Sequence, residues 1–321
     1  MAAVLTNGKG FYDPLVYVLE SYRLGLKFLP STVNEPGPAF SVHGNAIRVP
    51  LTRAKGLTER MVKRLLAERE RGLFISLADF HCRVMPSPEE LEAMIRAGGF
   101  DEFGQTRTRQ FWEAQRLAKL SAFGKATARQ GSQSLEFDFE AGTNPVSDFF
   151  AQNPALLREP TRRERLEVET ELFGYAVSGH PLELFADVAW DTYCPVAHLG
   201  EHVGETVVTC GLVVEQRTHH QITGEPMKFL TLADWTGIVE TELFAQTYKN
   251  YGLATVRYPV LEVTATVEPF ENRRGFSLRV LRAGKPRQNQ TPRKSEDIGT
   301  RNAFDSFQRA STETAFSPRS T

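Results

Sequence analysis

The sequence predicts a multidomain α+β protein, in which a helical region is followed by a five-stranded β-barrel. Three observations lead to this prediction. At 321 residues, the chain exceeds the usual length of one domain. Apolar residues recur with helical spacing between Ile47 and Leu120, whereas from Glu205 onward they alternate with the period of a β-strand. A stretch rich in Gly, Ser, Gln, Asn and Pro separates the two patterns, as a linker would.

The composition is that of a protein from a reducing, aqueous compartment. Hydrophobic residues make up 41% of the chain, yet no apolar run approaches the ~20 residues that span a membrane. The first residues lack the basic and apolar regions of a secretory signal. The 3 cysteines have no paired spacing, which disfavours a disulfide framework. We therefore predict a cytoplasmic protein with no membrane partner.

The charges are unevenly distributed, although the net charge is only −1. Residues 41–130 contain 16 Lys and Arg against 10 Asp and Glu, a balance of +6. Residues 131–200 contain 4 against 12, a balance of −8. A polyanionic partner is expected to meet the first segment and to avoid the second.

The first predicted region, residues 1–43, contains one helix and a short extended stretch. Asp13 suits the helix cap and Pro14 the first helical position, while Gly25 lies where the helix should end. Four side chains share an apolar face of this helix: Leu15, Val18, Leu19 and Tyr22. Because so small a region buries little, we predict that it is the edge of a larger domain and that its apolar face needs a partner.

The second region, residues 44–120, reads as two helical hairpins in tandem. A glycine turn, Lys55-Gly56-Leu57-Thr58, separates a helical pattern that starts at Ile47 from a helix that Thr58 caps. Farther along, Ser87-Pro88-Glu89-Glu90 forms a capping box with proline at the first helical position. The second hairpin contains no Gly-x-Gly turn, so it is predicted to serve as a packing partner.

The glycine turn has the features of a helix-hairpin-helix motif, which binds DNA without reading its sequence. In such a motif, backbone N–H groups at a helix N-terminus face a phosphate, and the helix dipole assists. Thr58 stands where a second glycine is usual, and its hydroxyl is expected to add a donor. The predicted duplex-binding residues are Lys55, Gly56, Leu57, Thr58, Arg60, Lys63 and Arg64. The alternative is a structural corner with a solvated basic face.

The remaining regions are a flexible linker (121–163), a helical connector (164–200), a barrel domain (201–284) and a disordered tail (285–321). Turn signals separate five candidate strands: Thr206–Val214, Met227–Ala233, Ile238–Phe244, Val260–Val267 and Phe276–Leu281. A short helix at Ala245–Tyr251 lies between the third and fourth strands. This order is typical of the OB fold, a five-stranded barrel. The fold class is thus a helix-hairpin-helix region followed by an OB-fold domain.

OB folds commonly bind single-stranded nucleic acid by combining a basic groove with stacking aromatic residues. The predicted backbone contacts are Arg217, Lys228, Arg273 and Arg274, and the predicted stacking residues are Trp235 and Phe270. The alternative is a barrel that binds another protein, since a fold alone does not choose between ligands.

We predict no catalytic residue and no metal site. The alternating carboxylates Glu136, Asp138 and Glu140 lie in the linker, where nothing would fix them for magnesium. The spacing of Cys194, His198, His202 and Cys210 fits no common zinc site. We find neither a nucleophile triad pattern nor a phosphate-binding Gly-x-x-x-x-Gly-Lys run.

A series of segments in order resembles the C-terminal part of the bacterial DNA polymerase III alpha subunit. They are KGFYDPLVYVLESYRLG, LPSTVN, AIRVPLTRAKGLTER, SLADFHCRV, LEAMIRAGGFDEFG, ELFGYAVSGHPLE and MKFLTLADWTGIVETELF. The resemblance covers roughly residues 1–283, apart from the linker. It implies the end of a fingers region, a tandem helix-hairpin-helix domain that holds duplex, and an OB domain that meets single-stranded template.

The resemblance also implies what this sequence lacks. The polymerase activity of the family depends on palm-domain aspartates that hold two magnesium ions, and no such segment is present in this sequence. We therefore expect no polymerase activity and no cofactor in this chain alone. Its expected partner is DNA, as primer–template duplex and single strand. Two alternatives remain: half of a split polymerase that needs a separate N-terminal chain, and a protein-interaction module that binds other replisome proteins.

Overall fold

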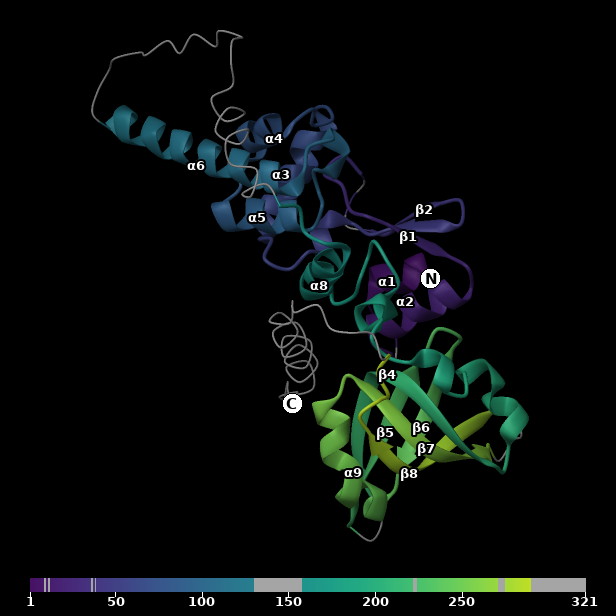
Figure 1. Ribbon diagram of the computed structural model, residues 1–321. Helices are drawn as coiled ribbons and strands as arrows, with labels where there is room; N and C mark the ends of the chain where they lie inside the picture. The colour runs from purple at the N-terminus through teal and green to yellow at the C-terminus, as the bar shows by residue number, and fades with distance from the viewer. Residues whose placement is uncertain are drawn as a thin grey trace, which may run out of the picture. The chain divides into compact units, whose positions relative to one another are not determined.

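The computed structural model describes residues 1–289 except 9, 11, 36, 38, 130–157, 222–223 and 271–274, with backbone only for 120–129 (Figure 1). The described chain forms two compact units. One unit comprises Met1–Phe28, Val42–Ile47 and the chain from Gly174 onward, and the other comprises Leu29–Ser41 and Arg48–Phe173. We call them the barrel unit and the helical unit. The predicted disordered tail lies almost entirely outside the described residues, as does most of the predicted linker.

Within its described residues, the helical unit contains five α-helices around one core. They are α3 (Glu59–Glu70), α4 (Leu77–Val84), α5 (Pro88–Arg96), α6 (Arg107–Arg129) and α8 (Arg162–Phe173). The 3₁₀ turn Leu51–Arg53 precedes α3 in the chain, and the 3₁₀ turn Asp101–Phe103 lies between α5 and α6. Phe74, Phe80 and Phe100 form the centre of the core, with edge-to-face ring pairs whose centroids are 5.0 Å apart. The predicted capping box at Ser87 is confirmed.

The segment before the glycine turn is not the helix that the sequence predicted. Residues Ala46–Arg48 form strand β3, and only the 3₁₀ turn Leu51–Arg53 follows before Gly56. Pro50 accounts for the difference, because a residue that precedes a proline, here Val49, is disfavoured in helical geometry. The hairpin therefore has one full helix, α3, on the C-terminal side of its turn. Strand β3 lies between β1 (Lys27–Leu29) and β2 (Ser41–His43) in a small sheet.

The N-terminal helices belong to the barrel unit. They are α1 (Ala2–Asn7) and α2 (Pro14–Arg23), and Asp13 caps α2 as predicted. The apolar face of α2 was predicted to need a partner, but Leu15, Val18 and Leu19 are at most 4% exposed. The Tyr22 hydroxyl donates to the Gly179 carbonyl at 3.0 Å. This burial removes the observation that motivated a split polymerase.

The five predicted strands form a closed barrel, which confirms the predicted fold class. They are β4 (Thr206–His220), β5 (Pro226–Ala233), β6 (Ile238–Leu243), β7 (Val260–Pro269) and β8 (Phe276–Gly284). The order around the barrel is β4-β5-β6-β8-β7, and helix α9 (Ala245–Arg257) connects β6 to β7. The pair β6–β8 is parallel and the others are antiparallel, the arrangement of an OB fold. Inward-facing aliphatic side chains such as Leu230 and Leu261 fill the interior.

The segment between α8 and the barrel contains 3₁₀ turns at Pro181–Phe185, Trp190–Thr192 and Val196–His202. The compact units divide the predicted connector 164–200 between Phe173 and Gly174, because Leu172 packs in the helical core whereas Tyr175 packs against Phe28 in the barrel unit. Among the described helices, none is both long and apolar enough to cross a membrane.

Candidate nucleic-acid interface

The glycine turn before α3 has a fixed backbone. Gly56 has a φ of 89°, in the left-handed region that a side chain disfavours. The Lys55 amide donates to the carbonyl of Leu172 at 2.9 Å, and Leu57 packs partly buried against the helical core. The turn therefore presents the N-terminus of α3 in one defined position.

The Thr58 amide and hydroxyl and the Met61 amide at this N-terminus are already engaged within the protein. The Thr58 hydroxyl accepts a hydrogen bond from the Met61 amide at 3.2 Å, which caps the helix. The same hydroxyl donates to Oε1 of Glu90 at 2.5 Å, and the Thr58 amide donates to that oxygen at 3.2 Å. The prediction that the Thr58 hydroxyl adds a donor for phosphate is therefore wrong in this structure, because a carboxylate from α5 holds it.

The basic side chains of α3 lie outside this contact. Lys55, Arg60 and Lys63 are exposed. Lys63 forms an ion pair with Glu59 at 2.7 Å, in which both side chains are more than 70% exposed, so the pair is weak and screened. Arg64 is half-buried, and its Nε donates to the Arg83 carbonyl at 3.2 Å. Three of the predicted cations are thus exposed, and the fourth is partly held.

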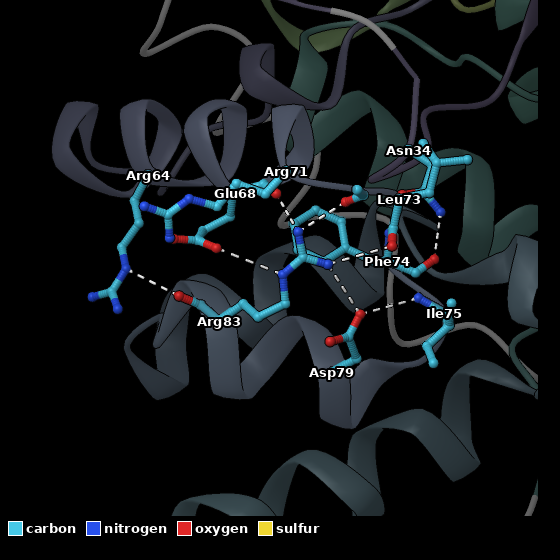
Figure 2. Close-up of polar contacts among 10 residues, drawn as sticks. Asn34, Arg64, Glu68, Arg71, Leu73, Phe74, Ile75, Asp79 and Arg83 are labelled. Carbon is cyan, nitrogen blue, oxygen red and sulfur yellow. Dashed lines mark hydrogen bonds and ion pairs between the residues drawn. The ribbon is translucent and has the colours of Figure 1, made fainter.

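The other end of α3 is held by a guanidinium group (Figure 2). Arg83 of α4 donates to the carbonyls of Glu68, Gly72 and Leu73, which lie at and just beyond the C-terminus of α3. It also pairs with Asp79 at 3.2 Å and lies over the Phe74 ring at 4.4 Å. A cation at the C-terminus and a carboxylate at the N-terminus both complement the helix dipole.

A groove of about 700 Å³ adjoins the N-terminus of α3. Its lining combines the capping residues Thr58, Ser87 and Glu90 with the basic side chains Arg60 and Arg64. Residues of α6 close another side, so the groove lies wholly within the helical unit. It offers an entry route toward the helix N-terminus.

The outer face of β4, β5 and β6 carries a second hollow, of about 480 Å³. Arg217 lies opposite Phe229 in the strand register, and Phe229 is 37% exposed. Arg217 also pairs with Glu215 at 2.5 Å. Glu240 lines the same hollow and accepts a hydrogen bond from the Tyr12 hydroxyl at 3.5 Å. The face therefore mixes one guanidinium and two aromatic rings with two carboxylates.

Lys228 does not belong to this surface, contrary to the prediction. Its side chain is buried, with the residue only 5% exposed, and its Nζ donates to the Thr255 hydroxyl of α9 at 2.8 Å. Burial lowers the pKa of Lys228, as expected for a cation removed from water. Helix α9 covers this part of β5, so Lys228 cannot reach a DNA backbone.

The two predicted stacking residues have different surroundings. Trp235 is 44% exposed, and the His180 ring stacks on it with centroids 4.5 Å apart. Phe270 is 39% exposed and lies against the backbone at Gly275, where an added Cβ would come within 2.9 Å of its ring. Arg273 and Arg274 lie outside the described residues, so their predicted role stays a prediction.

His180 should make the stability of the barrel unit depend on pH. Its Nδ1 accepts a hydrogen bond from the Leu182 amide, and burial lowers its pKa from 6.5 to about 4. Because the unfolded chain binds this proton more readily, the stabilisation is complete above pH 6.5 and is lost as the pH falls toward 4. We expect the free energy of unfolding to fall by about 1–2 kcal/mol between pH 7 and pH 4, after allowing for partial exposure of the ring to water.

Urea unfolding followed by tryptophan fluorescence at pH 7 and pH 4 would measure this loss. His180→Asn keeps an acceptor for the Leu182 amide and should reduce the pH dependence of the free energy of unfolding. His198→Asn is the matched control, because His198 is an exposed residue paired with Glu201. If both substitutions changed the pH dependence of the free energy of unfolding equally, the prediction would be contradicted.

The described residues do not fit a magnesium site. No group of three or more His, Cys, Asp or Glu side chains within them could hold a metal ion. His198 and His202 pair with Glu201 and Glu205, and Cys210 is buried with a raised pKa. We therefore derive no metal-dependent step for this part of the chain.

Sequence reasoning missed five residues of these sites: Glu90, Glu215, Glu240, Tyr12 and Phe229. The capping box at Ser87 pointed to Glu90 as a local cap, but its contact with Thr58 joins residues 32 positions apart. Glu240 lies in the predicted strand Ile238–Phe244, whose alternation does not indicate cross-strand neighbours, and Glu215 lies one residue beyond the predicted end of the first strand at Val214.

In comparison with known proteins, this chain is similar to bacterial DNA polymerases. A family model described as a helix-hairpin-helix motif matches residues 25–110. The DNA polymerase III subunit alpha of Thermus aquaticus is 30% identical over 293 residues, which cover 88% of this chain and 22% of that protein. Its counterpart in Deinococcus radiodurans is 32% identical, and the match covers 77% of this chain and 19% of that protein. An error-prone DNA polymerase of Symbiobacterium thermophilum is 27% identical, and the match covers 76% of this chain and 25% of that protein. The chain thus spans about a fifth to a quarter of the length of these curated relatives.

Proposed function

This chain is a relative of the bacterial DNA polymerase III alpha subunits over the segment that it shares with them, and on that premise we propose that it is a DNA-binding segment of such a polymerase. It would hold DNA during replication or repair synthesis, and the described residues would contribute no chemical step. The observation that carries the proposal is the surface of exposed cations, Lys55, Arg60 and Lys63, around the fixed turn at Gly56.

Duplex DNA would meet this surface through its phosphates. Long basic side chains on a helix attract the backbone without contacting base edges, so the binding would be independent of sequence and sensitive to salt. Because the Thr58 donors are engaged by Glu90, the exposed basic side chains would make most of the contacts. This role suits a polymerase segment, which must hold any sequence.

Single-stranded template would meet the outer face of β4, β5 and β6. Phe229 and Tyr12 offer rings on which bases can stack, and Arg217 offers a backbone contact. Glu215 and Glu240 would repel phosphates, so the strand would have to lie with its bases toward this face. Carboxylates accept hydrogen bonds from the amino groups of bases, which makes that orientation favourable.

A fluorescence-anisotropy titration tests the proposal. The intact chain would be titrated against a primer–template junction, a blunt duplex and a single strand, each at 50 and 200 mM salt. We expect the junction to bind most tightly, because only it engages both units, and we expect affinity to fall with salt for all three. No measurable binding to any of them would contradict the proposal.

The carboxylates of the barrel face favour a second role for that unit. A surface with Glu215 and Glu240 beside two aromatic rings also suits a basic segment of another replication protein. The same titration separates the two roles. If the blunt duplex binds but the single strand does not, the barrel is assigned to protein binding while the helical unit keeps its DNA role.

A further inference from the structure

One row of residues crosses the three strands that line the hollow on the barrel face. Thr231 of β5 lies opposite Glu215 of β4 on one side and opposite Glu240 of β6 on the other. Neighbouring strands lie about 4.8 Å apart, so the row spans roughly 10 Å, a length comparable with one nucleobase. All three residues line the hollow, together with Tyr12 and Phe229. A single base in the hollow can therefore reach the whole row.

The hydroxyl of Thr231 is an unused hydrogen-bonding group at the centre of this row. The residue is only 8% exposed and lines the hollow. Within the described part of the chain, its side-chain hydroxyl has no hydrogen-bond partner. Because a buried polar group without a partner costs free energy, a ligand that accepts a hydrogen bond from this hydroxyl is favoured.

The two carboxylates beside Thr231 differ in what they already bind. Arg217 donates to Oε1 of Glu215 from both Nε and Nη2, at 2.8 and 2.5 Å, so that carboxylate is paired. Glu240 is exposed, and the hydrogen bond that it accepts from the Tyr12 hydroxyl is long and weak, at 3.5 Å. Glu240 therefore keeps acceptor capacity for a ligand, whereas Glu215 positions a guanidinium group.

We propose that the hollow selects one guanine base of the single strand, through the Glu240 carboxylate and the Thr231 hydroxyl. The Watson–Crick edge of guanine presents two adjacent donors, N1–H and the N2 amino group, and beside them the acceptor O6. A carboxylate accepts from both donors at once, and the hydroxyl donates to O6. This inference rests on the proposed function, because it names the base that the same barrel face prefers.

The other bases do not present this pattern of donors and acceptors. Adenine and cytosine carry an acceptor nitrogen beside their amino group, and that nitrogen would face the Glu240 carboxylate unfavourably. Thymine has a single N–H donor between two carbonyl acceptors. Each of these bases leaves Glu240 with one hydrogen bond and a repulsive neighbour. The rings of Tyr12 and Phe229 can stack on any base, so they add affinity without selecting among bases.

Short thymidine oligonucleotides that differ only at the central position test the proposal. Fluorescence anisotropy with the intact chain would compare a central guanosine with a central inosine, which lacks only the N2 amino group, and with thymidine. We expect the guanosine strand to bind about tenfold more tightly than the inosine strand, because inosine loses a hydrogen bond to a charged acceptor. Equal affinities for the three strands would overturn the proposal.

Two substitutions assign the preference to the named side chains. Glu240→Gln replaces one acceptor oxygen with an amino group and should reduce the preference for guanosine over inosine to about twofold or less. Thr231→Val keeps the shape of the side chain and should weaken the guanosine and inosine strands alike, by about fivefold.

The matched control is Glu205→Gln, because Glu205 is a carboxylate of the barrel unit that pairs with His202 and does not line the hollow. It should leave the guanosine preference unchanged. Retention of the full preference in Glu240→Gln would contradict the proposal.

Free nucleotides separate this inference from the proposed function. Guanosine and inosine monophosphates would be titrated into the wild-type chain while the amide chemical shifts of Thr231 and Glu240 are followed. If single strands bind but neither they nor the free nucleotides show a preference for guanine, the inference fails and the proposed function stands. If guanosine monophosphate shifts these amides more than inosine monophosphate but no oligonucleotide binds, the base preference is supported and the proposed function fails.

Discussion

Replacement of Lys55, Arg60 and Lys63 together by alanine is expected to weaken duplex binding by about 10²–10³-fold at 50 mM salt. All three side chains are exposed around one turn and the first helical turns of α3, where they can each neutralise a phosphate. The slope of log K against log[salt] should become shallower by about 2.7, because three contacts no longer release counterions. Fluorescence anisotropy with a blunt duplex at several salt concentrations measures both quantities.

The control for this variant removes the same charge elsewhere. Lys249, Arg257 and Lys285 are exposed on the barrel unit, and their joint replacement by alanine changes the net charge equally. Its effect on duplex affinity should be small, since the long-range part of the field is screened beyond about 10 Å at 0.1 M salt. Equal losses in the two variants would show that overall charge, rather than the surface of α3, governs binding.

The features that the sequence predicted well depend on neighbours within a few residues. Asp13, Thr58 and Ser87 cap helices where they were expected, because a cap bonds an amide only two or three positions away. The strands of the barrel were predicted because apolar and polar residues alternate along a strand that is buried on one face. Four of these strands extend beyond their predicted bounds, most of all β4, whose exposed residues beyond Glu215 carry no such alternation, whereas β6 ends one residue early, at Leu243.

The failures have equally specific causes. The apolar spacing that begins at Ile47 suggested a helix, but Pro50 disfavours helix at Val49 and the segment is a strand and a 3₁₀ turn. Lys228 was assigned to the surface, although Thr255, 27 positions away on α9, covers it. Glu90 was recognised only as a cap because its second contact is long-range. Such contacts depend on how distant segments pack together, and a local sequence pattern cannot predict that packing.

Arg83→Met is expected to destabilise the helical unit by about 2–4 kcal/mol, the largest stability effect that we predict. Arg83 holds the carbonyls of Glu68, Gly72 and Leu73 and pairs with Asp79, while its side chain is only 23% exposed. Methionine fills much of the same volume but leaves those carbonyls and the Asp79 carboxylate without their cation. Hydrogen exchange of the α3 and α4 amides, with urea unfolding, measures the loss.

The matched control is Arg71→Met, because Arg71 pairs with the Glu68 carboxylate, as Arg83 does at 3.6 Å, but the Arg71 side chain is 76% exposed. Loss of this exposed ion pair should lower the free energy of unfolding by no more than about 0.5 kcal/mol. The DNA affinity of Arg83→Met should stay close to that of the wild type at temperatures where the unit is folded, since Lys55, Arg60 and Lys63 remain exposed. The substitution would then lower the stability of the helical unit without lowering its DNA affinity. The guanidinium holds the C-terminus of α3, whereas the expected phosphate contacts lie at its N-terminus. A parallel loss of affinity in the folded variant would instead mean that the Arg83 side chain positions the cations on α3, through its hold on the C-terminus of that helix.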